Sequence, residues 1–150
     1  MDSLWVALEH SALGGYVRNS TFLYPAANII HVLAVLSFFG LVATMDLRLL
    51  RVIDGTPARE VIARLRPLAL IAFLAIAVTG FILFTAEATA ISGNIAFQVK
   101  VTAIVLALLN VSLNSWAMKR HGEAMARLTA GVSLGSWLFI AAMGRTIAYV

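Results

Sequence analysis

Four long apolar runs, each bounded by polar or turn-forming residues, dominate the pattern of this chain. They cover about residues 24–45, 67–86, 95–118 and 124–149, and the third follows Ser92-Gly93-Asn94, a turn and helix-capping signal. A helix rises about 1.5 Å per residue, so about twenty residues cross the roughly 30 Å of a bilayer's hydrocarbon core. Strand-like alternation between turns is not seen, which argues against a β-barrel. The pattern predicts an all-α bundle of four transmembrane helices.

Two shorter segments have the spacing of amphipathic helices. In the segment 3–17, apolar side chains recur among polar neighbours at positions Leu4, Trp5, Leu8, Ala12 and Tyr16. Such a segment lies along the bilayer surface, so an N-terminal interfacial helix is predicted before the first run. A second amphipathic piece begins at Thr56-Pro57, carries several arginines, and is expected to end or kink at Pro67.

Composition places the chain with membrane proteins and narrows its partners. Of its 150 residues, 61% are hydrophobic and 12% are charged, and the mean hydropathy is +0.94. A single membrane domain, 1–150, is predicted, with the lipid bilayer as its first partner. The formal charge of +4 comes from basic residues that flank the apolar runs, which argues against nucleic acid as a partner. Cysteine is absent, which excludes disulfides and thiolate metal sites.

The distribution of Lys and Arg predicts the orientation in the membrane. The first connection carries five arginines and the third carries a further basic group, whereas the N-terminal segment has only Arg18 and the segment 87–94 has no Lys or Arg. Basic loops stay in the cytoplasm, so both termini are expected outside. For a bacterial inner membrane, this means a multi-pass protein with both termini in the periplasm.

Three ionisable side chains lie inside the apolar runs: His31, Lys100 and Arg145. A charge at membrane depth is costly, so such residues normally face the bundle interior and mark functional sites. His31 and Lys100 are each expected roughly 10 Å inside the outer start of their runs, and Arg145 about one turn from the outer end of the last. The same level holds four further candidates, Asn28, Glu87, Gln98 and Met143. The sequence therefore predicts a ligand-binding polar layer on the outer side of the membrane.

Helical spacing predicts which faces of the last two runs point inward. The third run has a small and polar stripe made of Lys100, Ala103, Ala107, Asn110 and Asn114. The fourth has a similar stripe made of Gly131, Gly135, Leu138, Ala142, Arg145 and Tyr149. Small and polar residues are typical of helix interfaces in membranes, and Asn110 and Asn114 are expected to hydrogen-bond between helices.

Each candidate also has an ordinary structural explanation. Lys100 can extend its stem to the outer headgroups, and Arg145 can bind lipid phosphate. Glu87 can be a loop acid or the counter-ion of Lys100. His31 lies too deep to reach the surface, but a neutral imidazole can be satisfied by a backbone carbonyl or by Asn28. The same holds for side chains outside the layer. Asp46 and Arg48, at the cytoplasmic end of the first span, can form a local ion pair or anchor the loop, and Trp5, Trp116 and Trp137 can be interfacial or packing residues.

An imidazole, two cations and one acid in a nearly dry layer suit an anionic or amphiphilic ligand. Haem b is one candidate, with His31 as axial ligand, Met143 as a conceivable second ligand, and Lys100 and Arg145 neutralising the propionates. A quinone head group bonded by His31 and Lys100 is equally permissible. Copper is the weaker candidate, because His31 lacks a cluster of His or Met ligands and two cations lie near it. Hydrolytic and transferase motifs are absent, so the chain is at most an electron-transfer protein.

Several segments together resemble a known family: Tyr24-Pro25, Ile30-His31, Asp46-Leu47-Arg48-Leu49-Leu50, Asn94 to Lys100, and Gly144 to Tyr149. Over nearly the whole chain they resemble an uncharacterised bacterial family of four-helix inner-membrane proteins, a domain of unknown function distantly similar to the CopD copper-resistance membrane domain. The resemblance adds Asp46, Arg48 and Asn94 to the positions of interest. It also implies a histidine late in the third span, where this chain has Asn114, and this difference weakens a two-histidine cofactor site.

Three hypotheses follow. The leading one is a membrane protein that binds a small ligand in the outer polar layer, most concretely in a haem b or quinone redox role. The second, implied by the CopD likeness, is copper handling or transport with His31 as a metal ligand. The third is an accessory subunit that does no chemistry and whose polar layer binds lipid, another membrane protein or a second copy of the chain.

Overall fold

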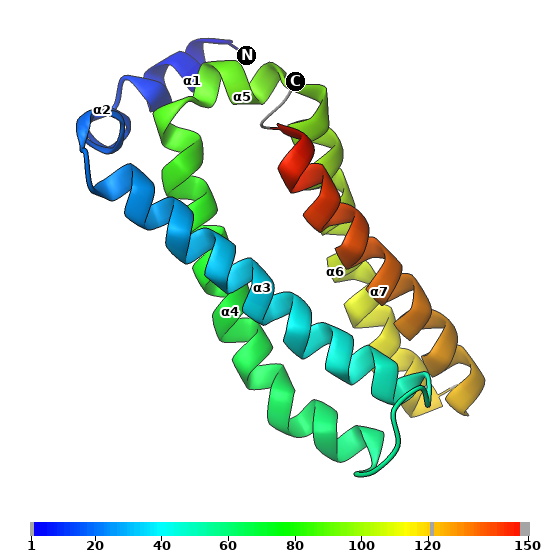
Figure 1. Ribbon diagram of the computed structural model, residues 1–150. Helices are drawn as coiled ribbons and strands as arrows, with labels where there is room; N and C mark the ends of the chain where they lie inside the picture. The colour runs from blue at the N-terminus through cyan, green and yellow to red at the C-terminus, as the bar shows by residue number, and fades with distance from the viewer. Residues whose placement is uncertain (1, 121, 148–150) are drawn as a thin grey trace.

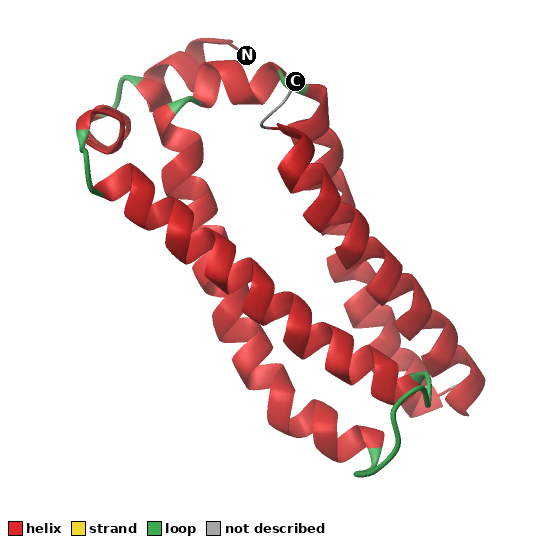
Figure 2. Cartoon of the chain, in the orientation of Figure 1, coloured by secondary structure: helices red, strands yellow, loops and turns green. Residues whose placement is uncertain are grey.

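The computed structural model describes the backbone of residues 2–120 and 122–147, and the side chains of these except 2, 114–120, 122 and 123. Every described element is a helix, as predicted (Figure 2). The four long helices are α3 (Leu23–Leu49), α4 (Ala58–Ala86), α6 (Ile95–Arg120) and α7 (Gly122–Thr146), and the short ones are α1 (Asp2–Glu9), α2 (Ala12–Asn19) and α5 (Ala88–Gly93).

The long helices confirm the membrane class. Stretches of α3, α4, α6 and α7 are each long and apolar enough to cross a bilayer. Many large apolar side chains on them are exposed, including Leu36, Leu74 and Leu106 at 60% or more. In a soluble protein such a surface would aggregate, whereas in a bilayer it contacts acyl chains. The chain is a multi-pass integral membrane protein.

The long helices form two antiparallel pairs. Contacts are most extensive between α3 and α4 and between α6 and α7, and the pairs touch each other along α3 and α7 (Figure 1). Short helices α1, α2 and α5 gather at one end of the bundle, here called the short-helix end. The α3–α4 connection lies at the opposite end, the loop end. The pairs lie close together toward the loop end and diverge toward the short-helix end.

An aromatic core fills the contact between the pairs, here called the α3–α7 seam. Phe38 of α3 lies edge-on to Trp137 of α7, with ring centroids 4.6 Å apart, and Phe73 of α4 lies 5.6 Å from Phe38. Phe38 and Trp137 are buried together with Val42, Ala69, Ala107 and Ile140. Large rings fill the space where three helices meet, while alanines let α6 approach α7 closely.

The predicted inward face of α6 agrees with the structure and that of α7 does not. Ala107 and Asn110 are buried, and the Asn110 amide donates to the Thr129 carbonyl of α7 over 2.9 Å. Asn114, by contrast, lies outside the described side chains. On α7, Gly131 and Gly135 are exposed with open space beside them. The buried face of α7 is instead made of Ala126, Thr129, Ala130, Ser133, Trp137 and Ile140. Alanines at that face already allow close approach, so the glycines are left on the outer surface.

The N-terminal segment is two helices rather than one continuous helix over 3–17. The break occurs at His10-Ser11, where the Ser11 hydroxyl donates to the Leu8 carbonyl and accepts from the Gly14 amide. These bonds end α1 and cap α2, which is what a serine side chain does at an N-cap. The break turns α2 against α4, where Gly14 and Val17 are buried.

Two further segments differ from the predicted helix boundaries: α4 and the segment that follows it. Helix α4 runs continuously from Ala58 to Ala86 with Pro67 inside it, so the helix does not end at the proline. The segment 87–94 is not an open loop, because α5 occupies most of it. Asn94 then caps α6 as predicted, since its side-chain oxygen accepts from the Phe97 amide over 3.2 Å.

At the loop end, Arg48 anchors the turn between α3 and α4. Its guanidinium donates to the carbonyls of Ile53, Gly55 and Thr56. Gly55 has a φ of +126°, a conformation that L side chains rarely adopt. Arg48 is therefore the loop anchor that the sequence suggested, and its planar guanidinium suits three converging carbonyls.

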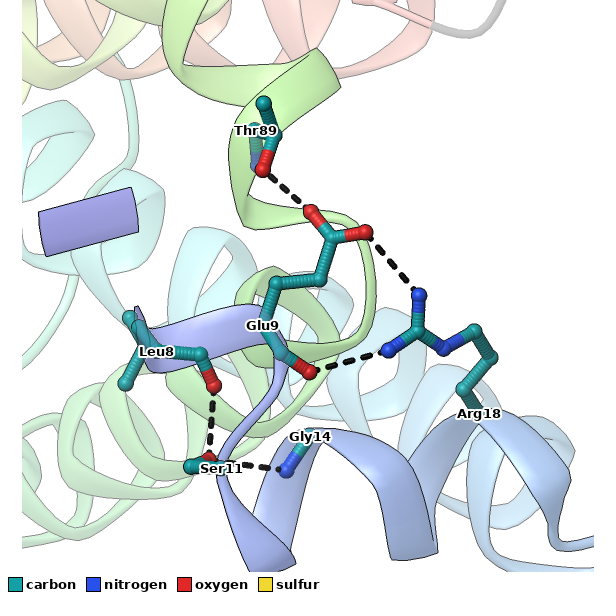
Figure 3. Close-up of polar contacts among 6 residues, drawn as sticks. All are labelled: Leu8, Glu9, Ser11, Gly14, Arg18 and Thr89. Carbon is teal, nitrogen blue, oxygen red and sulfur yellow. Dashed lines mark hydrogen bonds and ion pairs between the residues drawn. The ribbon is translucent and has the colours of Figure 1, made fainter. Parts of the chain in front are cut away.

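At the short-helix end, Glu9 joins three helices (Figure 3). Arg18 of α2 donates to the Glu9 carboxylate and to its backbone carbonyl, each over 2.9 Å, and the Thr89 amide of α5 donates to the other carboxylate oxygen over 2.8 Å. In the sequence, Glu9 is simply one of the polar neighbours along the interfacial segment 3–17. The contact spans 80 residues of sequence, so spacing gave no sign of it.

The stabilisation that the Glu9 contacts provide at the short-helix end is expected to weaken in acid. Hydrogen bonds from the Thr89 side chain and backbone, and then the charge of Arg18, hold the pKa of Glu9 below its ordinary value of 4.5. A lowered folded pKa means that the stabilisation is complete above about pH 4.5 and is lost as the pH falls through the folded value. Thermal unfolding from neutral to acidic pH should therefore show a stability difference between the wild type and Glu9→Gln that shrinks below that pH. Glu60→Gln, which removes an exposed pair with Arg64, is the control and should differ little from the wild type at any pH. A constant difference for Glu9→Gln would contradict this role.

Candidate functional site

His31 of α3 is held against α4 by a hydrogen bond. Its Nδ1 lies 2.9 Å from the Thr79 hydroxyl oxygen, and that hydroxyl is itself 2.6 Å from the Ala75 carbonyl. A threonine hydroxyl has one proton, which goes to the carbonyl, so its oxygen accepts from His31 Nδ1–H. The network thus assigns the tautomer of the neutral ring: Nδ1 carries the proton and Nε2 carries the lone pair.

A glycine on α4 makes room for the imidazole. A Cβ at Gly80 would lie 3.1 Å from His31 Cε1, a tighter contact than most real side chains make. Thr79 and Gly80 are adjacent, so one residue orients the ring and the next lets it approach the helix. Neither residue was predicted as part of the site, although a Thr-Gly pair is a polar and small interruption of an apolar run that can be seen in the sequence.

Lys100 has the same relation to α7. Its side chain is half-buried, and a Cβ at Gly144 would lie 3.3 Å from the Lys100 Nζ. Lys100 is also close enough for its charge to act on the His31 imidazole. His31 and Lys100 thus occupy equivalent positions, one in each helix pair, and each packs on a glycine of the neighbouring helix.

The other predicted site residues are more exposed than His31 or have no described contact with it. Asn28, Glu87 and Arg145 are exposed, and Met143 is half-buried on α7 beside Gly144. Glu87 is the junction between α4 and α5. Arg145 follows Gly144 near the end of α7, at the short-helix end. Its guanidinium can anchor the helix to lipid headgroups there.

Gln98 belongs to a different part of the molecule. Its amide donates to the Ser92 carbonyl over 2.9 Å, which ties α6 to α5. Gln98 also lines a cavity of about 530 Å³. Neither His31 nor Lys100 lines this cavity. Its walls are formed by Trp5, Phe84, Ser92, Gly93, Phe97, Gln98, Val101 and Thr102. Stacked Phe84 and Phe97, 5.2 Å apart, and edge-on Trp5 form its aromatic wall.

The donor set does not suit a metal held by protein ligands alone. Among the described residues, no three His, Cys, Asp or Glu side chains come together. His31 can supply one imidazole nitrogen, and Met143 is the nearest thioether on α7 in sequence to Gly144. A copper site of the usual His and Met kind needs more such ligands.

Comparison of this chain with family models, curated proteins and solved structures found no match. The likeness to a four-helix inner-membrane family and to CopD therefore stays a prediction from sequence.

Proposed function

We propose that this membrane protein binds a quinone-class ligand in its reduced, hydroquinone form, between the helix pairs toward the short-helix end. His31 and Lys100 are the binding groups. The observation that carries the proposal is the Nδ1 bond to Thr79, because it leaves the imidazole lone pair on Nε2 for a ligand. Lys100 is the second binding group, and its charge acts on the ring.

A hydroquinone complements this pair of groups. Its ring carries two hydroxyls on opposite sides, each of which can donate and accept a hydrogen bond. His31 Nε2 accepts from one hydroxyl, and the Lys100 ammonium donates to the oxygen of the other. An oxidised quinone has two carbonyls and nothing to donate to Nε2, so the reduced form should bind more tightly. Such ligands dissolve in the bilayer and carry two electrons and two protons.

Binding of decylubiquinol and decylubiquinone to the protein in lipid nanodiscs tests the proposal. The wild type is expected to bind the reduced form with higher affinity. Thr79→Val keeps the size of the side chain and removes the acceptor of Nδ1–H, so it should weaken binding by about tenfold, the value of one oriented hydrogen bond of about 1.4 kcal/mol. His31→Gln should weaken binding at least as much and reduce the preference for the reduced form.

The matched control is His10→Gln, since His10 is exposed between α1 and α2. Its affinity should equal that of the wild type. If the wild type and His31→Gln each bound the two redox forms with equal affinity, the imidazole would not be recognising the ligand ring. Lipid or partner binding would then be left as the role of the polar layer.

Haem b is the second candidate, because the same tautomer favours it. Metal-ligating histidines normally donate the other ring N–H to an oxygen, as His31 does to Thr79. His31 would be the axial ligand, with Met143 as second ligand and Lys100 beside the propionates, and the group would supply electron transfer. A Soret band in the purified protein that His31→Gln abolishes supports this reading, and a colourless protein that binds decylubiquinol supports the first.

The orientation also remains a proposal. The loop end carries Arg51 in the connection and Arg59 and Arg64 in the first turns of α4, and it would face the cytoplasm of a bacterial inner membrane. The short-helix end, with the His31 and Lys100 centre, would then face the periplasm. Protease protection of tags placed in the 50–57 connection of right-side-out vesicles would test this orientation.

A further inference from the structure

The structure contains a second polar centre, which lies toward the loop end and far from His31. Asp46 is in the last turn of α3 and is only 4% exposed. Its Oδ2 is buried without a hydrogen-bond partner. Fifteen residues separate it from His31, which is about 22 Å along a helix. The two centres are therefore separate sites on one helix.

Among the side chains that the structure describes, the groups found beside the carboxyl are uncharged. Ser133 of α7 is 3% exposed, and its hydroxyl is the hydrogen-bonding group beside Asp46. Trp137, one turn further along α7, has its Nε1 buried without a partner. Within the described residues, the helices packed against α3 carry these charged side chains: Arg18 of α2, Arg59, Glu60, Arg64 and Arg66 of α4, and Arg127 and Arg145 of α7. Of these, Arg64 is paired with Glu60, and on α3 itself Arg48 bonds the loop carbonyls.

An ionised carboxylate in this position would be expensive. A buried charge needs a counter-charge or several hydrogen bonds, and one oxygen of Asp46 has neither. A protonated carboxyl avoids most of that cost, because only a neutral polar group is then buried. Ionisable groups at such depth in membrane proteins commonly hold and pass protons.

We propose that Asp46 is a proton-binding site in the α3–α7 seam that exchanges its proton with the loop-end side of the membrane. The ligand is a proton. On release, the O–H bond of the carboxylic acid breaks and the proton passes to water, leaving a carboxylate and transferring no electron. The path is short, since α3 ends three residues later at Leu49 and the exposed connection 51–57 follows.

Proton release would act on the whole bundle because of where the carboxyl lies. The seam is the contact between the two helix pairs, and Ser133 and Trp137 are both on its α7 side. A charge created there favours water entry and separation of α3 from α7 at the loop end. Asp46 thereby couples the pH on that side to the packing of the pairs.

Infrared spectroscopy of the full chain in lipid nanodiscs tests the proposal directly. A protonated carboxyl has a C=O band above the amide I region, and an ionised one does not. In mildly acidic buffer the wild type is expected to show this band and to lose it reversibly as the pH is raised. Asp46→Asn should abolish it, Ser133→Ala should shift it, and Asp54→Asn, at an exposed acid of the connection, should leave it unchanged.

A second measurement separates a proton site from a merely structural acid. Asp46→Asn is a neutral mimic of the protonated state, so its thermal stability at neutral pH should equal or exceed that of the wild type. It should also lack the wild type's decline in stability as the pH rises from acidic to neutral. A spectrum without the band in mildly acidic buffer, a band that persists in Asp46→Asn, or an Asp46→Asn protein much less stable than the wild type would each overturn the proposal.

Discussion

Replacing Gly14 by alanine is expected to destabilise the short-helix end by about 3 kcal/mol, at the upper end of the usual cost of overpacking. A Cβ at this position would lie 2.5 Å from the Glu9 carbonyl, 2.7 Å from that of Thr85 and 2.9 Å from that of Leu8. All three atoms are backbone, so no side chain can rotate away. The α1–α2 break and the contact of α2 with α4 would both have to shift.

Gly15→Ala is the matched control, because it lies in the same short helix and a Cβ there has nothing within 4 Å. Alanine is the better helix former by roughly 0.5–1 kcal/mol, so Gly15→Ala should be neutral or slightly stabilising. Thermal unfolding followed by circular dichroism and by the fluorescence of Trp5 would compare the two variants. Equal midpoints for Gly14→Ala and Gly15→Ala would mean that α2 does not pack on α4 in the membrane.

Replacing Trp137 by alanine should cost about 3–5 kcal/mol, as is usual when a large buried ring is deleted. Trp137 is 5% exposed, and its ring lies 4.6 Å from that of Phe38 and 6.3 Å from that of Phe73. Deleting it removes the contact that joins the two helix pairs. Because lipid cannot easily enter the centre of the seam, the lost dispersion contacts are not replaced.

Two further variants make the test specific to the seam. Leu138→Ala, at the next position but 54% exposed, should change stability by less than about 0.5 kcal/mol. Trp137→Phe keeps an aromatic ring and removes an indole N–H that has no partner, so it should cost much less than Trp137→Ala. Unfolding by a denaturing detergent, read by circular dichroism, would rank the three. A loss for Leu138→Ala as large as that for Trp137→Ala would place the seam on the wrong face of α7.

The candidate site was predictable in part, for reasons that differ between residues. Depth along a helix follows from residue count, so His31 and Lys100 could be assigned to the same end of the bundle before the helices were assembled. Thr79, Gly80 and Gly144 could not be found this way. They belong to helices antiparallel to those of His31 and Lys100, and pairing them requires the register between two helices, which no local pattern contains.

Helix rotation was harder to predict than helix position. For α6, one face alone carries Lys100, Ala107 and Asn110, and that face is the inner one. For α7, small residues occur on both faces, so the stripe of Gly131 and Gly135 and the stripe of Ala126, Ala130 and Ser133 were equally plausible. Burial of Trp137 between α3 and α4 decided in favour of the second.

The sequence by itself determined the four membrane helices, the end at which each intramembrane ionisable group lies, and caps such as Asn94. These depend on length, hydropathy and neighbours within one turn. Only the tertiary structure decided that Glu9 joins α1, α2 and α5, that Thr79 orients His31, and that Asp46 is buried against Ser133. In a bilayer an outward apolar face costs nothing, so hydrophobicity does not distinguish the inner face of a helix from its lipid face. That choice comes from shape and hydrogen bonding between helices, which exist only once the helices are assembled.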